Sequence, residues 1–307
     1  MRTATLLLIA AAAAFAQGRG HTPMRSKIAV YDVAAKSSRV IFTADVIWEA
    51  PNWSPDGKFL LVNSGAKLYR LAPDGAGAPE PIAVGQQYRC NNDKAFSWDG
   101  KLLGFSASVS GGRGSQVFVA SADGSGAKLL TPATPSYFHG WSPDNRWMAF
   151  VAQRDGKTFH LFRVAIEGGE EQQLTTAGDY DDGPEYTPDG KWIYFNSVRS
   201  GGWDIWRMPA AGAGPNDAKA ERVTSDELED WFPHISPDGK RMVWLSFPKG
   251  TKDHDGRIEG VQLRMSAPDG KKPQTLTTFF GGQGSINVNS WSPDSKQFAY
   301  VIYEPIK

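Results

Sequence analysis

The chain contains one cysteine, Cys90, among its 307 residues. A single cysteine allows no intramolecular disulfide and no cluster of thiolate metal ligands. An excess of charge of either sign is also missing, because lysine and arginine number 33 and aspartate and glutamate number 33. Since phosphate binding requires a basic surface, this balance argues against nucleic acid as a partner.

Long hydrophobic runs are scarce too. The apolar run from Leu6 to Phe15 is shorter than the ~20 residues that a membrane-spanning helix needs. Arg2 precedes this run, and Ala14-Phe15-Ala16 forms an A-x-A cleavage site at its end. We therefore predict a signal peptide over residues 1–16, rather than a buried N-terminal helix. The mature protein is expected to be periplasmic or secreted and not membrane-spanning, without a lipid anchor because no cysteine follows the run.

Turn-forming and aromatic residues are plentiful, with 33 glycines, 20 prolines and 11 tryptophans. This composition favours many short strands over helices. One phrase recurs six times, 43 to 56 residues apart, and such periods predict propeller blades of four strands each. The copies are WSPDGK from Trp53, FSWDGK from Phe96, WSPDNR from Trp141, YTPDGK from Tyr186, ISPDGK from Ile235 and WSPDSK from Trp291.

Each phrase predicts a tight turn between the innermost and second strands of a blade, because Pro, Asp and Gly suit turn geometry. The last phrase belongs to only two strands, two fewer than a full blade needs. Two unassigned strands begin near the other end of the chain, at Lys27 and Ser38. A sixth blade built from both chain ends would close the ring and remove its exposed sheet edges. We predict an all-β, six-bladed β-propeller over residues 24–305.

The phrase W-S-P-D-G-K followed by an apolar strand resembles the repeat of TolB-type propellers, and the resemblance covers nearly all of the chain after residue 16. It implies a six-bladed propeller that binds a protein or peptide in the cell envelope. TolB also carries an α/β domain ahead of its propeller, and we expect none here. Related blades occur in prolyl-oligopeptidase-type peptidases and in oligogalacturonate lyases. A peptidase would need a G-x-S-x-G hydrolase domain, which this sequence lacks, and the lyases imply a metal site of several histidines.

Ligands are expected at the rim where the innermost strands begin, just before each phrase, where the loops between second and third strands also lie. The six stretches there are unlike one another, and their carboxylates, amides and aromatic rings would suit a sugar-like or peptide-like ligand. The candidate polar residues are Glu49, Arg89, Asn92, Asp93, His139, Asp181, Asp182, Glu185, Glu229, Asp230, His234, Gln283, Asn287 and Asn289. The aromatic candidates are Trp48, Tyr137, Tyr180 and Trp231.

Glu185 and His234 occupy the same position in adjacent repeats, so they could form a carboxylate–imidazole pair for acid/base chemistry. We favour a blade-to-blade hydrogen bond for this pair. Asp182 is the remaining catalytic candidate. A divalent metal at His139 and His234 is conceivable but not favoured, and no other cofactor is expected. The long loop Phe247–Gly260 could form a lid over the rim, although we favour a solvated charged loop.

Two functions remain open. The favoured one is a binding module for an envelope protein, a peptide or an oligosaccharide, acting as a monomer. The alternative is a carbohydrate-active enzyme, a polysaccharide lyase or glycoside hydrolase, that uses the acidic and histidine residues of the rim. The first rests on the resemblance to TolB-type propellers at the level of the fold.

Overall fold

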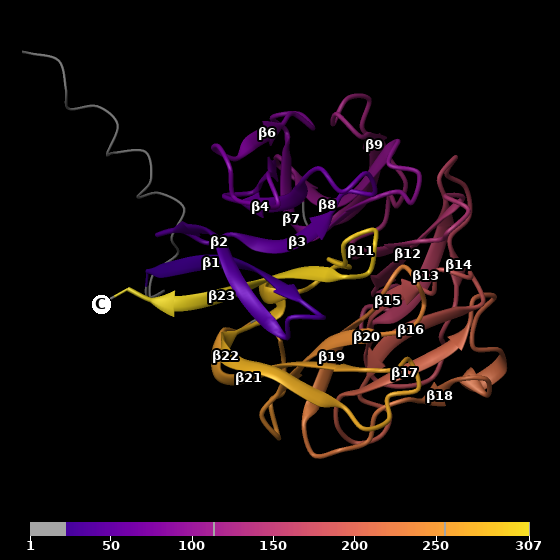
Figure 1. Cartoon of the computed structure of the whole chain (residues 1–307). Coiled ribbons are helices and arrows are strands. Elements are labelled where there is room, and N and C mark those ends of the chain that lie inside the picture. The colour runs from indigo at the N-terminus through magenta and orange to yellow at the C-terminus, as the bar shows by residue number, and fades with distance from the viewer. Residues whose placement is uncertain (1–22, 113, 255, 307) are drawn as a thin grey trace, which may run out of the picture.

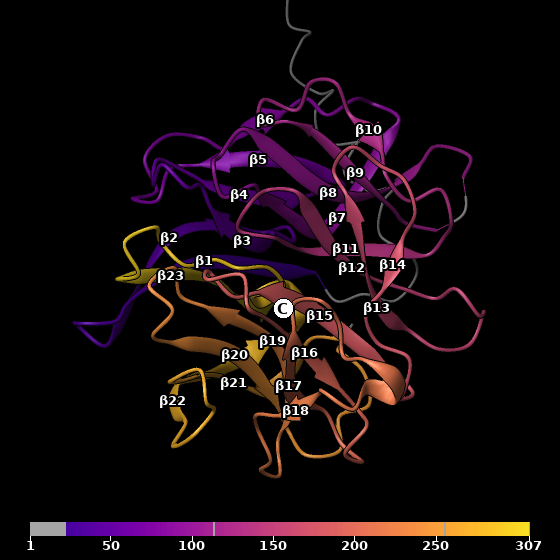
Figure 2. The ribbon, with the colours of Figure 1, turned by 90° about the vertical axis from the view of Figure 1, so that its right-hand side faces the viewer.

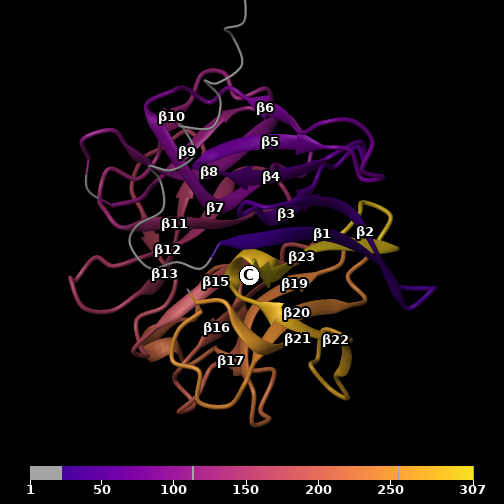
Figure 3. The same cartoon turned by 90° about the vertical axis from the view of Figure 1, so that its left-hand side faces the viewer.

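The computed structural model describes residues 23–112, 114–254 and 256–306; the predicted signal peptide lies outside these residues. The described residues form six antiparallel sheets arranged in a ring. The innermost strands surround the ring axis and the outermost strands lie at its periphery, as views from opposite sides show (Figures 2 and 3). The prediction of a six-bladed, all-β propeller is confirmed.

Five blades each hold four consecutive strands, ordered from the axis outward. Blade 1 comprises β3 (Glu49–Trp53), β4 (Leu60–Ser64), β5 (Lys67–Leu71) and β6 (Glu80–Ile82). Blade 2 comprises β7 (Tyr88–Phe96), β8 (Leu102–Val109), β9 (Gln116–Ser121) and β10 (Lys128–Leu129). Blade 3 comprises β11 (Ser136–Trp141), β12 (Trp147–Ala152), β13 (His160–Ala165) and β14 (Gln172–Gln173). Blade 4 comprises β15 (Asp181–Tyr186), β16 (Trp192–Ser197), β17 (Asp204–Pro209) and β18 (Glu221–Arg222). Blade 5 comprises β19 (Glu229–Ile235), β20 (Met242–Phe247), β21 (Ile258–Ser266) and β22 (Gln274–Gly281).

The sixth blade joins the two ends of the described chain. Its sheet is β2-β1-β23, in which β1 (Met24–Asp32) pairs with both β2 (Ser37–Ala44) and β23 (Gln297–Pro305). Figure 1 shows the indigo β1 beside the yellow β23. The innermost segment of this blade contributes an isolated bridge, Trp291 to Phe298, in place of a regular strand. Closure by both ends, as predicted, ties the first blade to the last.

The repeated phrase forms the same hydrogen-bonded turn in every blade. In blade 5, Ser236 Oγ donates to Asp238 Oδ1 at 2.6 Å and accepts from Arg241 N at 3.0 Å. Asp238 Oδ1 also accepts from Lys240 N at 3.1 Å. Gly239 has a φ of 70°, which glycine adopts without steric cost. A hydroxyl–aspartate pair of this kind, with Thr187 in place of serine in blade 4, therefore fixes each turn from within, and the apolar strand that follows packs between blades.

A β-bulge interrupts the innermost strand of each complete blade. The pairing register shifts between Glu49 and Asn52, Cys90 and Lys94, Phe138 and Gly140, Asp182 and Glu185, and Trp231 and His234. A bulge re-aims the side chains around it. In this ring, the bulges all lie just before the repeated turns, so they decide which polar side chains face the axis.

Candidate ligand-binding mouth of the central channel

Two cavities lie along the ring axis. The larger, about 350 Å³, is found where the innermost strands begin, and we call it the approach mouth. The smaller, about 200 Å³, is found at the repeated turns, and we call it the turn mouth. His139 lines both, so the cavities meet at this residue. The approach mouth is lined by Asn91, Asn92, Asp93, Tyr137, His139, Val151, Phe159, Tyr180, Asp182, His254 and Gln283.

Asp182 lines the approach mouth, and each of its carboxylate oxygens contacts a histidine ring. Its Oδ1 lies 3.1 Å from His139 Nε2 and its Oδ2 lies 3.3 Å from His254 Nε2. Burial alone would raise the pKa of Asp182, but His139 and His254 outweigh it and hold that pKa below its usual range. Burial likewise opposes protonation of His139, yet Asp182 and Asp93 raise its pKa. Asp182 is therefore a carboxylate with imidazole donors on both oxygens.

Asp93 is a second buried carboxylate in the same cavity. Its Oδ1 accepts from Asn287 Nδ2 at 2.6 Å, and its Oδ2 accepts from Asn91 Nδ2 at 2.6 Å. Burial raises the pKa of Asp93, against the opposing effects of His139 and Asn287. Both partners are neutral amides, so neither of these hydrogen bonds is an ion pair.

The cation nearest to Asp93 in sequence does not neutralise it by direct contact. Lys94 is fully buried, and its Nζ donates to the backbone carbonyls of Glu49 and Ala50. Burial lowers the pKa of Lys94 to about 7. This lysine therefore joins blades 1 and 2 behind the cavity.

Aromatic rings form a continuous wall on one side of the approach mouth. Ring centroids are 6.4 Å apart for Tyr137 and Phe159, 4.9 Å for Phe159 and Tyr180, and 5.0 Å for Tyr180 and Trp203. Trp203 continues to Trp231 at 4.8 Å. Blades 3 to 5 thus supply an apolar, polarisable face, whereas blade 2 and the segment before Trp291 supply amides.

The long loop after β20 is largely the solvated charged loop that we favoured, since Lys249, Lys252 and Asp253 are exposed, but one of its residues points inward. His254, in this loop, is buried against the rings of Trp231 and Phe232, with centroids 5.8 and 5.2 Å away, and reaches Asp182. Its carbonyl accepts from Gln283 N at 3.2 Å. The aromatic contacts and the buried carboxylate explain why this part of the loop folds inward. The described part of the loop therefore helps to build the mouth.

Glu185 and His234 lie together, as their matching positions suggested, with Oε2 2.5 Å from Nδ1. The other oxygen of Glu185 accepts from Ile235 N and from Asn289 Nδ2, at 3.0 and 2.6 Å. His234 Nε2 lies 3.0 Å from the carbonyl of Ile286. These bonds join blades 4, 5 and 6. Glu185 and Asn289 line the turn mouth, so this cluster is separate from Asp182.

Several other candidates lie away from the approach mouth. Asp230 and Trp231 are fully buried within blade 5, where Asp230 Oδ1 accepts from Ser246 Oγ. Glu49 accepts from Arg257 NH2 at 2.6 Å and from Asn63 at 3.1 Å. Arg89 is exposed. The structure thus brings together eight of the candidates and separates the others from them; the eight are Asn92, Asp93, Tyr137, His139, Tyr180, Asp182, Gln283 and Asn287.

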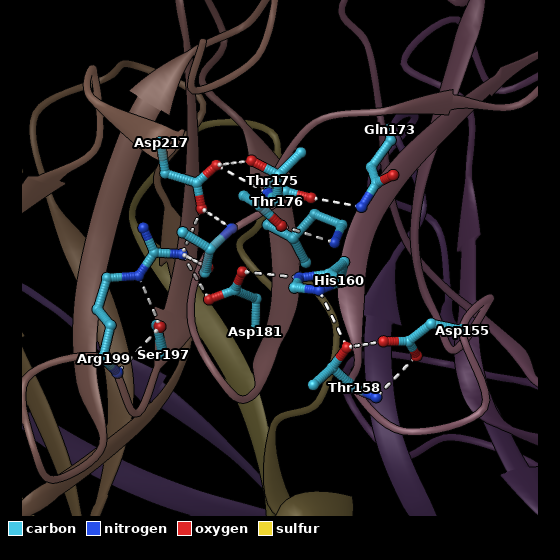
Figure 4. A network of polar contacts seen from close by, with 12 residues as sticks. Asp155, Thr158, His160, Gln173, Thr175, Thr176, Asp181, Ser197, Arg199 and Asp217 are labelled. Carbon is cyan, nitrogen blue, oxygen red and sulfur yellow. Dashed lines mark hydrogen bonds and ion pairs between the residues drawn. The ribbon is translucent and has the colours of Figure 1, made fainter. Parts of the chain in front are cut away.

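Asp181 shows how strand alternation divides neighbouring carboxylates. Whereas Asp182 faces the channel, Asp181 faces the contact between blades 3 and 4 (Figure 4). Its Oδ1 lies 2.7 Å from Arg199 NH2, which also lies 3.1 Å from Asp217 Oδ2. The hydrogen bond and charge of Asp181 raise the pKa of His160 despite burial. This network holds the start of β15, and with it Asp182, in place.

Sequence reasoning missed four lining residues of the approach mouth: Asn91, Val151, Phe159 and His254. Asn91 was adjacent to two chosen residues, so the stretch signalled it. Phe159 and His254 lie in loops between the second and third strands of their blades, not before a repeated turn. No repeated sequence position marks either residue. In the part of the chain that the structure describes, no three His, Cys, Asp or Glu side chains form a metal-binding group. The same residues include no helix long and apolar enough to cross a membrane.

Fold and cavity together define a six-bladed propeller with an individual, polar channel mouth, and known proteins share this architecture. The sequence profile of the TolB beta propeller domain matches residues 134–256. An uncharacterized protein of Agrobacterium fabrum, Atu1656, is 40% identical over 284 residues, which cover 92% of this chain and 94% of that protein. The structure of a protein described as a TolB candidate from Agrobacterium tumefaciens superposes with a TM-score of 0.86 at 41% identity, covering 92% of this chain and 99% of that one.

The chain belongs to the TolB-like β-propeller family. The Tol-Pal system protein TolB of Francisella tularensis is a more distant relative, 25% identical over 252 residues that cover 79% of this chain. The match spans about half of that relative, 54% of its length. What TolB proteins assemble with therefore does not transfer directly to this chain.

Proposed function

We propose that this protein is an exported binding module that holds a polypeptide segment or another polar ligand of the cell envelope in its approach mouth. The observation that carries the proposal is the cavity of about 350 Å³, bounded by carboxylates, amides and aromatic rings from several blades. A concave site with a few convergent polar groups is the usual form of a binding site. The relatives named for the Tol-Pal system support a role in the envelope, and the predicted signal peptide supports export.

The carbohydrate-active alternative has less support from the geometry. An acid/base pair needs a carboxylate or imidazole free to reach a substrate proton. Both oxygens of Glu185 and both ring nitrogens of His234 instead bond to neighbouring blades. The Glu185–His234 cluster therefore joins the blades, which agrees with the interpretation favoured from the sequence.

Site-specific photocrosslinking in the native host tests the proposal. A benzophenone amino acid placed at Gln283, in the approach mouth, is expected to capture a ligand or partner from the periplasmic fraction. Matched probes at Pro237, in the turn mouth, and at exposed Leu129 serve as controls. Adducts from position 237 or 129 without adducts from position 283 would place the interaction elsewhere, and a cytoplasmic protein would contradict export.

A further inference from the structure

The charges and acceptors around the approach mouth indicate what kind of ligand it takes. Its lining includes two buried aspartates, and none of the described lining residues is a lysine or arginine. One carboxylate, Asp182, is matched by the imidazole of His139, whereas Asp93 is held by two neutral amides. Among the described lining residues an anionic ligand would therefore meet no lysine or arginine, whereas a ligand that donates hydrogen bonds would meet two carboxyl groups.

Unpartnered acceptors point the same way. His254 directs Nε2 at Asp182, so in the neutral ring the hydrogen is on Nε2 and the lone pair is on Nδ1. That Nδ1 is buried and has no hydrogen-bond partner among the described residues. Asn287 must turn its amide nitrogen to the carboxylate of Asp93, which leaves its buried Oδ1 as a second acceptor without a described partner. Buried acceptors of this kind are costly unless a ligand or water donates to them.

The aromatic wall supplies the third element. Tyr137, Phe159 and Tyr180 line the cavity, and their rings pack in sequence against one another. The face of an aromatic ring attracts a cation, and the attraction grows when the site excludes water. Carboxylate, acceptor nitrogen and aromatic faces together form the environment that recognises an organic ammonium group.

We infer that the approach mouth selects a ligand with an ammonium group on an apolar or ring-shaped body, bound between Asp93, His254 and the wall of Tyr137, Phe159 and Tyr180. This inference rests on the proposed function and specifies its ligand. An amino sugar and a lysine side chain share this chemistry. The ammonium N–H groups donate to Asp93 and His254 Nδ1, and the carbon body packs on the rings.

Calorimetric titration of the mature protein tests this with four probes. Glucosamine and N-acetyl-lysine amide carry the ammonium, and their fully N-acetylated counterparts lack it. We expect at least one ammonium probe to bind, its acetylated counterpart to bind at least tenfold more weakly, and added salt to weaken binding. Which ammonium probe binds distinguishes a sugar from a peptide source.

Variants locate the site. Asp93→Asn is expected to weaken the ammonium probe at least tenfold, whereas Glu80→Gln, an equal charge change at an exposed position on β6, should leave it unchanged. Tyr180→Leu should also weaken binding of the ammonium probe, although both aspartates remain. This variant keeps the test possible if Asp93→Asn does not fold. Equal affinity for ammonium and acetylated probes, unchanged affinity in both mouth variants, or no binding of either ammonium probe at millimolar concentration would overturn the inference. Adducts from Gln283 would still support the proposed function in each of those cases.

Discussion

The two ends of the innermost strands obey different rules. At the turn mouth, six hydroxyl–carboxylate pairs repeat with Oγ–Oδ1 distances of 2.5 to 2.7 Å, between Ser54 and Asp56, Ser97 and Asp99, Ser142 and Asp144, Thr187 and Asp189, Ser236 and Asp238, and Ser292 and Asp294. At the approach mouth, no two blades present the same side chains. A role that is the same in every blade is filled by the same residues in every blade. We therefore expect a ligand at the approach mouth, where the residues differ from blade to blade.

Departures from the pattern at the repeated end strengthen this contrast. Blade 2 has Trp98 where the five other blades have proline in the same position of the phrase, which leaves a backbone N–H to satisfy. Blade 3 has Asn145 in the place of glycine, and Asn145 Oδ1 accepts from Trp98 N at 2.7 Å. In the same way Ser295, the last departure, accepts from Asp238 N at 2.9 Å. The exceptions at this end are thus also structural, because each one bonds the turn of the neighbouring blade.

The largest expected effect is at the turn mouth, in the closing blade. Trp291 is buried against Phe298, and its Nε1 donates to the carbonyl of His234 at 3.1 Å. Trp291→Ala should lower the free energy of unfolding by about 3–5 kcal/mol, because it leaves a large cavity and an unpaired carbonyl. Urea denaturation of the folded variant measures this, with exposed Val40→Ala as the control. A loss below 1 kcal/mol would mean that the bridge at Trp291 does not hold the ring closed.

A second variant separates structural from ligand-binding residues at the approach end. Burial raises the pKa of Asp230 to about 7, against the opposing effects of Ser246, Thr224 and Arg264, with Asp226 acting in the same direction as burial. The folded protein therefore holds this proton more tightly than the unfolded chain. The associated stability is complete below about pH 4 and is lost as the pH rises through 7.

Asp230→Asn removes this titration. From pH 5 to pH 8 the wild type should lose roughly 2–3 kcal/mol of unfolding free energy relative to the variant. Chemical denaturation at both pH values measures the difference, and the exposed Asp123→Asn should show none over this range. Binding at the approach mouth should not change, because Asp230 does not line it. A difference independent of pH would show that Asp230 is ionised in the fold.

The six-bladed architecture could be predicted from the sequence, because the repeated phrase marks every blade. Spacing and strand pattern predicted the blades, and aligning the repeats placed Glu185 beside His234. The site was only half predictable. Asp230 and Trp231 do not line the mouth, although a bulge follows them in β19 as one follows Asp182 in β15, so aligning the repeats does not tell which side chains reach the mouth. His254 was missed because its place depends on contacts with Trp231 and Asp182 that a loop sequence does not reveal.

The smallest predicted effect tests whether the repeated end is uniform. Ser236→Ala removes one hydroxyl that donates to Asp238 and accepts from Arg241 N. The expected loss is about 1 kcal/mol, the usual net value of such a hydrogen bond. Ser54, Ser97, Ser142 and Ser292 make the same two bonds, so their alanine variants should lose the same amount in urea denaturation.

Exposed Ser37→Ala supplies the baseline, expected within about 0.5 kcal/mol of the wild type. None of the five turn variants should change ligand affinity at the approach mouth, since the hydroxyls belong to turns at the opposite end of the innermost strands. If one turn variant alone loses ligand binding, that blade uses its repeated turn for function as well as structure. The division between a structural end and a ligand-binding end would then fail at that blade, while the uniform stability losses of the other four would still support it elsewhere.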